Sequence, residues 1–165
     1  MIRLTNLADY AVVLMCQFPS DAGYRVSAVD LAEKTELPVP SVSKILNALA
    51  RADLLVSHRG LKGGFSLSRA AVDISVAEII EAVDGPISLT HCVDSDHSDC
   101  SVESVCAMRP HWQTINQAVR GALDGIRLSD INMQAAGTAL AQQLEAKSAA
   151  ITALNADEQT VDVAG

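Results

Sequence analysis

Two short amphipathic segments joined by a tight turn, and followed at once by a glycine-rich hairpin pattern, constrain the fold more than any other feature of the chain. Ser27 is a helix cap with an acid three residues later, and it predicts a helix that runs to about Lys34. Residues 35–38 form the turn. Pro40 suits the first turn of the next helix, because it lacks the amide hydrogen that would be unpaired there. This order predicts a helix-turn-helix.

The second helix of this pair has an apolar and a polar face. Four apolar residues recur at the spacing of one helix face and are expected to be buried: Val42, Ile45, Leu46 and Leu49. The opposite face carries hydroxyl, amide and cationic groups that can contact phosphates and base edges in a major groove. These candidate DNA-contact residues are Ser41, Ser43, Lys44, Asn47 and Arg51. A solvated helix face that binds no DNA shows the same pattern, so this face alone leaves both interpretations open.

A basic hairpin follows the second helix. Residues 54–56 and 65–67 are short strand candidates, and the glycines between them allow the positive φ angles of a hairpin tip. Arg59 and Lys62, with Gly63 beside them, lie where a wing touches the DNA backbone or the minor groove. A plain surface hairpin is the alternative. Together these elements predict a mainly α fold with a winged helix-turn-helix DNA-binding domain over residues 1–85.

Helical patterns flank this region on both sides. An apolar stripe over residues 7–18 predicts a first helix, and the Ser75 cap predicts another from 76 to 82 that ends at Gly85. A long helix starts at Pro110. Its apolar seam, with alternating spacings of three and four, is typical of a helix that pairs with a second copy: Trp112, Ile115, Val119, Ala122 and Ile126. Residues 110–133 are therefore expected to form a dimerisation region, with packing on its own domain as the alternative. The alanine-rich tail, 134–165, suggests no function.

Three of the four cysteines, Cys92, Cys100 and Cys106, lie in one polar loop, residues 86–109. Thiolates are soft ligands that suit iron–sulfur clusters. Their spacing is that of neither ferredoxins nor zinc fingers, so zinc and metal-free redox thiols stay open as alternatives. Cys16 lies on the apolar stripe of the first helix and is expected to be a small buried hydrophobe.

The charge of the chain is divided unevenly. The net charge is −8; residues 1–75 hold eight Lys/Arg and seven Asp/Glu, whereas residues 76–165 hold four and thirteen. Only the first part is compatible with phosphate contacts. No apolar run approaches the roughly 18 residues of a membrane span, and no signal peptide is evident, so we expect a cytoplasmic protein with reduced thiols and no membrane partner. No enzyme motif is present.

Several stretches carry a family resemblance. They are residues 3–5 and 9–12 (RLT and DYAV), 59–65 (RGLKGGF), 74–86 (ISVAEIIEAVDGP) and the three clustered cysteines. Over about residues 1–130 the chain resembles the IscR-like family of bacterial winged-helix iron–sulfur regulators, which includes the nitric-oxide sensor NsrR and the iron regulator RirA. It looks most similar to the subgroup that regulates the SUF operon for cluster assembly.

The resemblance implies a homodimer on double-stranded operator DNA and a cluster held by the three clustered cysteines, with 4Fe–4S preferred to 2Fe–2S. IscR-like members use a histidine three residues after the last cysteine, but here that residue is Arg109. In NsrR-like members an acid of the partner's first helix is the remaining ligand, and Asp9 occupies the matching place. His111 and His91 are the alternatives.

Together, the residues and the resemblance predict an iron–sulfur cluster-responsive transcription regulator that represses cluster-assembly (SUF) genes. The alternative is an iron–sulfur or zinc-binding adaptor that binds a protein through its winged helix and does not bind DNA. The acidic net charge favours the adaptor, whereas the basic hairpin tip favours the regulator.

Overall fold

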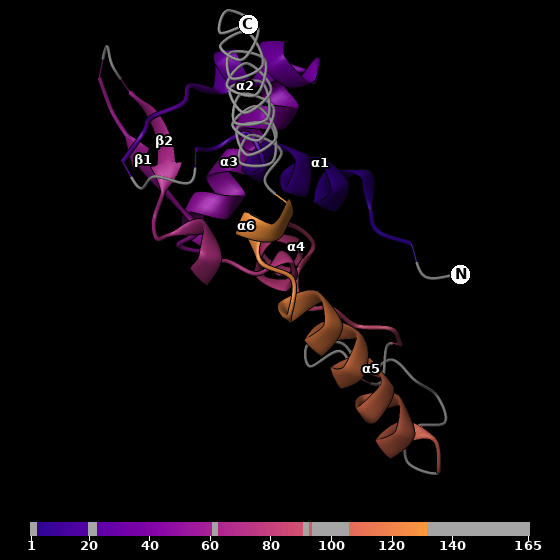
Figure 1. Ribbon diagram of the computed structural model, residues 1–165. Helices are drawn as coiled ribbons and strands as arrows, with labels where there is room; N and C mark the ends of the chain where they lie inside the picture. The colour runs from indigo at the N-terminus through magenta and orange to yellow at the C-terminus, as the bar shows by residue number, and fades with distance from the viewer. Residues whose placement is uncertain (1–2, 20–22, 61–62, 91–92, 94–105, 132–165) are drawn as a thin grey trace, which may run out of the picture.

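The chain is mainly helical, as its sequence predicts. The computed structural model describes residues 3–19, 23–60, 63–90, 93 and 106–131. In chain order, the elements are α1 (Asn6–Met15), α2 (Ala28–Thr35), α3 (Val39–Arg51), β1 (Leu55–His58), β2 (Gly64–Leu67), the 3-10 helix η1 (Ala71–Asp73), α4 (Val76–Asp84), α5 (Arg109–Asp124) and α6 (Leu128–Ile131). In Figure 1, α1–α4 and the β1–β2 hairpin form a head, and α5 extends from it on the side opposite the hairpin.

Helices α2 and α4 begin at the serine caps that the sequence predicts. The Ser27 hydroxyl accepts a hydrogen bond from the Asp30 amide at 3.1 Å, and the Asp30 carboxylate accepts one from the Ser27 amide. Ser75 and Glu78 form the same reciprocal pair at the start of α4. Each cap contributes about 1 kcal/mol, so these short helices begin at fixed residues.

Thr5 begins α1 and also joins α1 to α4. Its hydroxyl oxygen accepts a hydrogen bond from the Ala8 amide at 3.1 Å. The same hydroxyl donates to the Asp84 carboxylate, whose two oxygens lie at 2.7 and 2.8 Å. Since Asp84 is the last residue of α4, one side chain fixes the start of one helix beside the end of the other.

The core of the head lies between α1, α3 and α4. The four apolar residues predicted to line the inner face of α3 are all fully buried. Leu14 of α1 and Ile79 of α4 belong to the same core. Phe18 is buried as expected, but it lies beyond the end of α1 at Met15. Cys16 is also buried, and burial raises the pKa of its thiol, which agrees with a small hydrophobic role.

The wing has a third strand-like member that the sequence pattern did not reveal. β1 and β2 pair antiparallel, from Leu55 opposite Leu67 to His58 opposite Gly64. Val26 pairs with Phe65 through backbone hydrogen bonds of 2.9 and 2.8 Å, so the segment before α2 joins the sheet. Gly64 has a φ of +146°, and a Cβ there would lie 2.6 Å from the Val26 carbonyl oxygen. Only glycine fits this close approach.

Helix α5 is tied to the head near its C-terminal end. It has proline in its first turn, as predicted. The Arg120 guanidinium donates two hydrogen bonds of 2.9 Å to the Glu81 carboxylate of α4. Ile126, which the seam pattern placed on the same helix, lies beyond its end at Asp124, so that part of the expectation is wrong. Within the residues described, no helix is long and apolar enough to cross a bilayer.

Glu78 should make stability depend on pH. Burial opposes ionisation of its carboxyl, but hydrogen bonds from the Ser75 amide and the Arg69 guanidinium outweigh burial and lower its pKa. The stabilisation is therefore fully present above the ordinary glutamate pKa and is lost as the pH falls through the lowered value. We expect the difference in unfolding free energy between the wild type and Glu78→Gln, measured by urea denaturation, to shrink between pH 7 and pH 3.

Ser75→Ala is the matched control for this prediction, because it weakens the same cap without changing a charge. Its cost of about 1 kcal/mol should persist at low pH. A cost of Glu78→Gln that stays constant over the same pH range would contradict the assignment.

Candidate nucleic-acid interface and metal centre

The outer face of α3 presents most of the residues that the sequence assigned to DNA contact. Lys44, Asn47 and Arg51 are exposed, and Ser41 and Ser43 are half-buried. Because the inner face is fully buried, α3 cannot rotate about its axis without exposing its apolar stripe. The helix contains no acidic residue. It therefore offers donors and cations to a polyanion in a fixed orientation.

The hairpin tip carries an exposed cation on a tightly folded backbone. Arg59 is exposed and follows His58, whose Nε2 lies 2.9 Å from the buried Ser66 hydroxyl on the neighbouring strand. The Gly63 amide donates to the Gly60 carbonyl at 2.8 Å, and a Cβ on Gly63 would lie 2.6 Å from the His58 carbonyl oxygen. Gly63 thus has a structural reason to be glycine. Lys62 lies outside the described residues.

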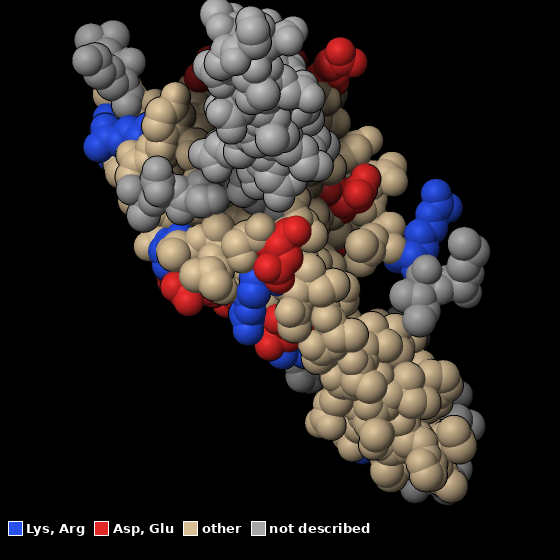
Figure 2. Space-filling model, in the orientation of Figure 1, with Lys and Arg blue, Asp and Glu red and all other residues tan. Residues whose placement is uncertain are grey.

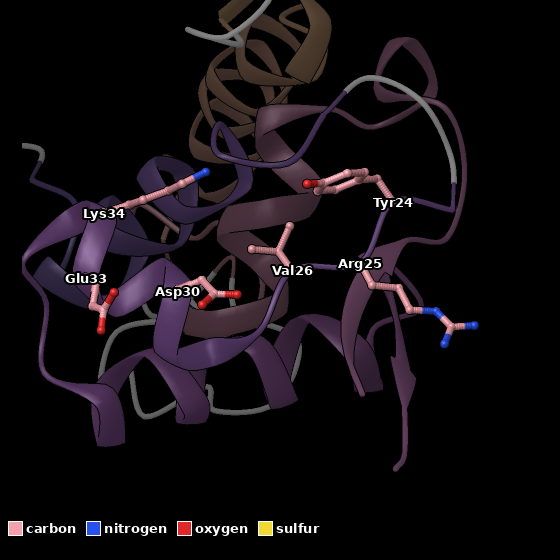
Figure 3. A pocket seen from close by; sticks show the side chains of 6 residues that line it. All are labelled: Tyr24, Arg25, Val26, Asp30, Glu33 and Lys34. Atoms are coloured by element: carbon pink, nitrogen blue, oxygen red, sulfur yellow. The ribbon is translucent and has the colours of Figure 1, made fainter. Parts of the chain in front are cut away.

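Figure 2 shows Lys and Arg side chains beside the hairpin and very little charge on the visible surface of α5. An open hollow of about 510 Å³ lies beside α2, between the segment 24–26 and the helix. Figure 3 shows Arg25 pointing away from the other side chains of this hollow. Arg25 is exposed and precedes the residue that pairs with β2, so it is a cation beside the wing. Its place beside the wing could not be predicted from the sequence, because a one-residue bridge has no periodic pattern.

The candidate metal ligands are only partly within the described residues. Cys106 is half-buried, forms no disulfide, and lies just before α5. Asp9 is exposed in the first turn of α1, and His111 is exposed in the first turn of α5. Cys92, Cys100 and His91 lie outside the described residues. In the part of the chain that is described, no three His, Cys, Asp or Glu side chains lie together as a metal site.

The donor set nevertheless fits an iron–sulfur group by its chemistry. Cys106 is free and accessible enough to bind a metal as a thiolate, and Cys16 is set apart by its burial in the core. Asp9 offers an oxygen donor on an outward-facing helix turn. Arg109, at the place where a histidine ligand would stand in IscR-like members, is the first residue of α5 and carries no lone pair for a metal.

The seam of α5 is largely uncovered within one chain. Ile115 keeps 41% of its surface exposed, and Ala122 is exposed as well. Ile126, just beyond the end of α5, is also 41% exposed. Trp112 and Val119 are half-buried. A surface helix normally packs its apolar stripe against another part of a protein. The exposed seam of α5 therefore offers an apolar surface on which a partner could pack.

A helix-turn-helix with an outward polar helix and a basic hairpin defines a winged-helix DNA-binding protein. The profile of the Rrf2 family, described as iron-dependent transcriptional regulators, matches residues 4–134. The chain belongs to this family. A helix-turn-helix transcriptional regulator of Azotobacter vinelandii is 31% identical over 131 residues, which cover 79% of each chain.

Solved structures agree with the observed fold. CymR, the global cysteine regulator of B. subtilis, superimposes with a TM-score of 0.62 at 26% identity, over 80% of this chain and 97% of CymR. IscR of T. potens does so with a TM-score of 0.58 at 27% identity, over 81% and 88%. The IscR-like resemblance and the winged-helix fold are thus confirmed, and these relatives are transcriptional regulators, not enzymes.

We predict different roles for the wing and for α3. Arg59→Ala or Lys62→Ala should weaken binding to all DNA sequences alike and lower the slope of log affinity against log salt by about one unit. Ser43→Ala, Lys44→Ala or Asn47→Ala should instead change sequence preference. Fluorescence anisotropy titrations at several salt concentrations, with operator and scrambled duplexes, measure both.

The control is Arg127→Ala, which removes a cation from the linker between α5 and α6 and should leave the salt slope unchanged. Wing variants that alter sequence preference, together with α3 variants that do not, would reverse the two roles.

Proposed function

We propose that the chain is a homodimeric, iron–sulfur cluster-responsive repressor of SUF genes in the cytoplasm. The observation that carries this proposal is the position of Cys106. Its free, half-buried thiol lies at the start of α5, the helix with the uncovered apolar seam. A ligand at this point would connect sensing with the surface through which two copies pair.

The proposed ligands are Cys92, Cys100 and Cys106 of one copy and Asp9 of the partner copy, with His111 or His91 as alternatives to Asp9. A bound cluster, 4Fe–4S in preference to 2Fe–2S, would supply a redox-active and removable link among these donors. Support comes from the soft thiolate set, the iron-dependent character of the family and the likeness to IscR.

We infer a division of labour along the chain. Residues 1–85 bind DNA, 86–109 hold the cluster, 110–133 pair the two copies, and no role is proposed for 134–165. Two heads would read half-sites about 34–36 Å apart through α3 and the wing. The proposed contacts are Ser41, Ser43, Lys44, Asn47, Arg51, Arg59, Lys62 and Gly63. Through Thr5 and Asp84, α1 is joined to the end of α4, so a link at Asp9 acts on the whole head.

The adaptor alternative is not retained, because the chain belongs to a family of transcriptional regulators. Zinc and metal-free redox thiols remain as outcomes of the experiment.

The decisive experiment compares cluster-loaded and cluster-free protein on one operator, without oxygen and at one salt concentration. We expect the loaded form to bind at least fivefold more tightly, because allosteric couplings typically reach about 1–3 kcal/mol.

Serine replacement of Cys92, Cys100 or Cys106 should remove iron and sulfide, whereas Cys16→Ser should not. Asp9→Ala should keep the thiolate ligands but make the cluster labile, and His111→Ala should not.

Two results would contradict this proposal. Stoichiometric zinc without sulfide in anaerobically purified protein would replace the iron–sulfur centre by a zinc site. Equal operator affinities of the loaded and cluster-free forms would leave the cluster without a regulatory role in DNA binding.

The dimer is tested at the seam of α5. Charged residues in place of Ile115 and Val119 should give monomers, because burying unpaired charges in an apolar interface is costly. Sedimentation velocity measures the mass, and operator binding should weaken strongly since each monomer reads one half-site. The matched control is Gln113→Glu, a new charge on an exposed residue of α5 outside the seam. A wild-type protein that sediments as a monomer and still binds the operator tightly would contradict this prediction.

A further inference from the structure

Asn116 is the one buried residue of α5, at 8% exposure, although it is polar. Both the nitrogen and the oxygen of its side-chain amide are hydrogen-bonded to the segment that follows α4. The Asn116 Nδ2 donates to the Ile87 carbonyl at 2.8 Å, and its Oδ1 accepts from the Leu89 amide at 3.0 Å. The pair of bonds resembles one rung of a β-ladder, with a side chain in place of the second strand.

These two bonds fix the first residues of the cysteine-bearing loop, 86–109, just before Cys92. Residue 89 is three positions before Cys92. At the other end of the loop, the Cys106 carbonyl accepts from the Arg109 amide at 3.5 Å, which places Cys106 against the first turn of α5. Both ends of the loop are thus held on the same helix, one through a side chain and the other through the backbone.

The segment anchored by Asn116 also contacts the DNA-binding head. The Glu81 carboxylate, already paired with Arg120 of α5, also lies 3.5 Å from the Ile87 amide. Glu81 belongs to α4, which packs against both α1 and α3. Residues 87–89 therefore lie at a junction of α4, α5 and the loop, and among the described residues there Asn116 is the one buried polar residue.

We propose that Asn116 is a positioning residue of the metal centre: its amide fixes residues 87–89 on α5 and so sets the point from which the cysteine-bearing loop starts. The inference rests on the proposed iron–sulfur function. A buried amide is costly unless both of its hydrogen-bonding sides are paired, and a leucine of similar size would pack in an apolar environment without that requirement. The amide is thus better suited to setting a loop than to filling space.

The test compares Asn116→Leu with the wild type by three measurements. Hydrogen exchange of the Leu89 amide in the cluster-free protein should become about five- to tenfold faster, as expected when one net hydrogen bond is lost. The rate of cluster loss to a chelator, followed anaerobically in visible absorbance, should rise at least about fivefold. Circular dichroism gives the Tm of each variant. Asn116→Asp keeps the acceptor for the Leu89 amide but sets an oxygen against the Ile87 carbonyl, so Leu89 exchange should stay slow while the cluster is still lost faster than in the wild type.

The matched control is Leu31→Ala on α2, a core residue away from α5. It lowers the Tm by leaving a cavity but should change the rate of cluster loss by less than about twofold, since it leaves the positions of the ligands unchanged. A purely structural role for Asn116 predicts instead that cluster loss follows the Tm in all variants, and that result would overturn the proposal.

Failure of the positioning role can be distinguished from failure of the proposed iron–sulfur function. An unchanged rate of cluster loss in Asn116→Leu, with faster Leu89 exchange, also overturns the proposal while leaving the cluster itself intact. A wild type that binds no cluster refutes the proposed function, and the positioning role falls with it. If Asn116→Leu does not fold, the comparison of Asn116→Asp with Leu31→Ala decides in its place.

Discussion

Burial of the apolar stripe of α3 is the constraint on which the reading of DNA depends. Its four members are fully buried in the core, where α3 packs against α1, α2, α4 and β1, and each contributes about 1.5–3 kcal/mol relative to exposure. Turning α3 by one residue, about 100°, would expose part of that stripe. The direction of Lys44 and Asn47 is therefore set by side chains on the opposite face of the helix. The core does not merely support the DNA-binding surface but determines which side chains compose it.

The polar side-chain links among α1, α4 and α5 differ from this core in kind. Thr5–Asp84, between α1 and α4, is an exposed hydrogen bond, and Arg120–Glu81, between α5 and α4, is a partly exposed ion pair. Such contacts typically contribute about 0–1 kcal/mol. They select one arrangement of α1, α4 and α5 without holding the fold together. Apart from these polar links, Leu123 of α5 packs against the small apolar cluster of Ala8, Val76 and Ile80. A shift of α5 would disturb this small cluster but not the main core of the head.

Most of the head could be predicted because its signals are local. Serine caps, Pro40 and the stripe of α3 act within one or two turns, and the structure has them where expected. The Val26–Phe65 bridge, the return of α6 to the core and the role of Asn116 could not be predicted, because each depends on residues far apart in sequence. In particular, an isolated asparagine beside the seam of α5 looks like an exposed polar position until the partners Ile87 and Leu89 are known. The candidate ligands were found by residue type; how they assemble is not a property of one stretch of sequence.

Anchoring of both ends of the cysteine-bearing loop on α5 has a consequence for how such a protein can diverge. Between two fixed anchors, doubling the length of a flexible segment adds only about 0.6 kcal/mol of closure entropy. Insertions and deletions between Leu89 and Cys106 should therefore be nearly neutral for folding, whereas changes at the anchors should not. The spacing of the cysteines in this region is therefore free to drift while the helices of the winged-helix domain stay the same.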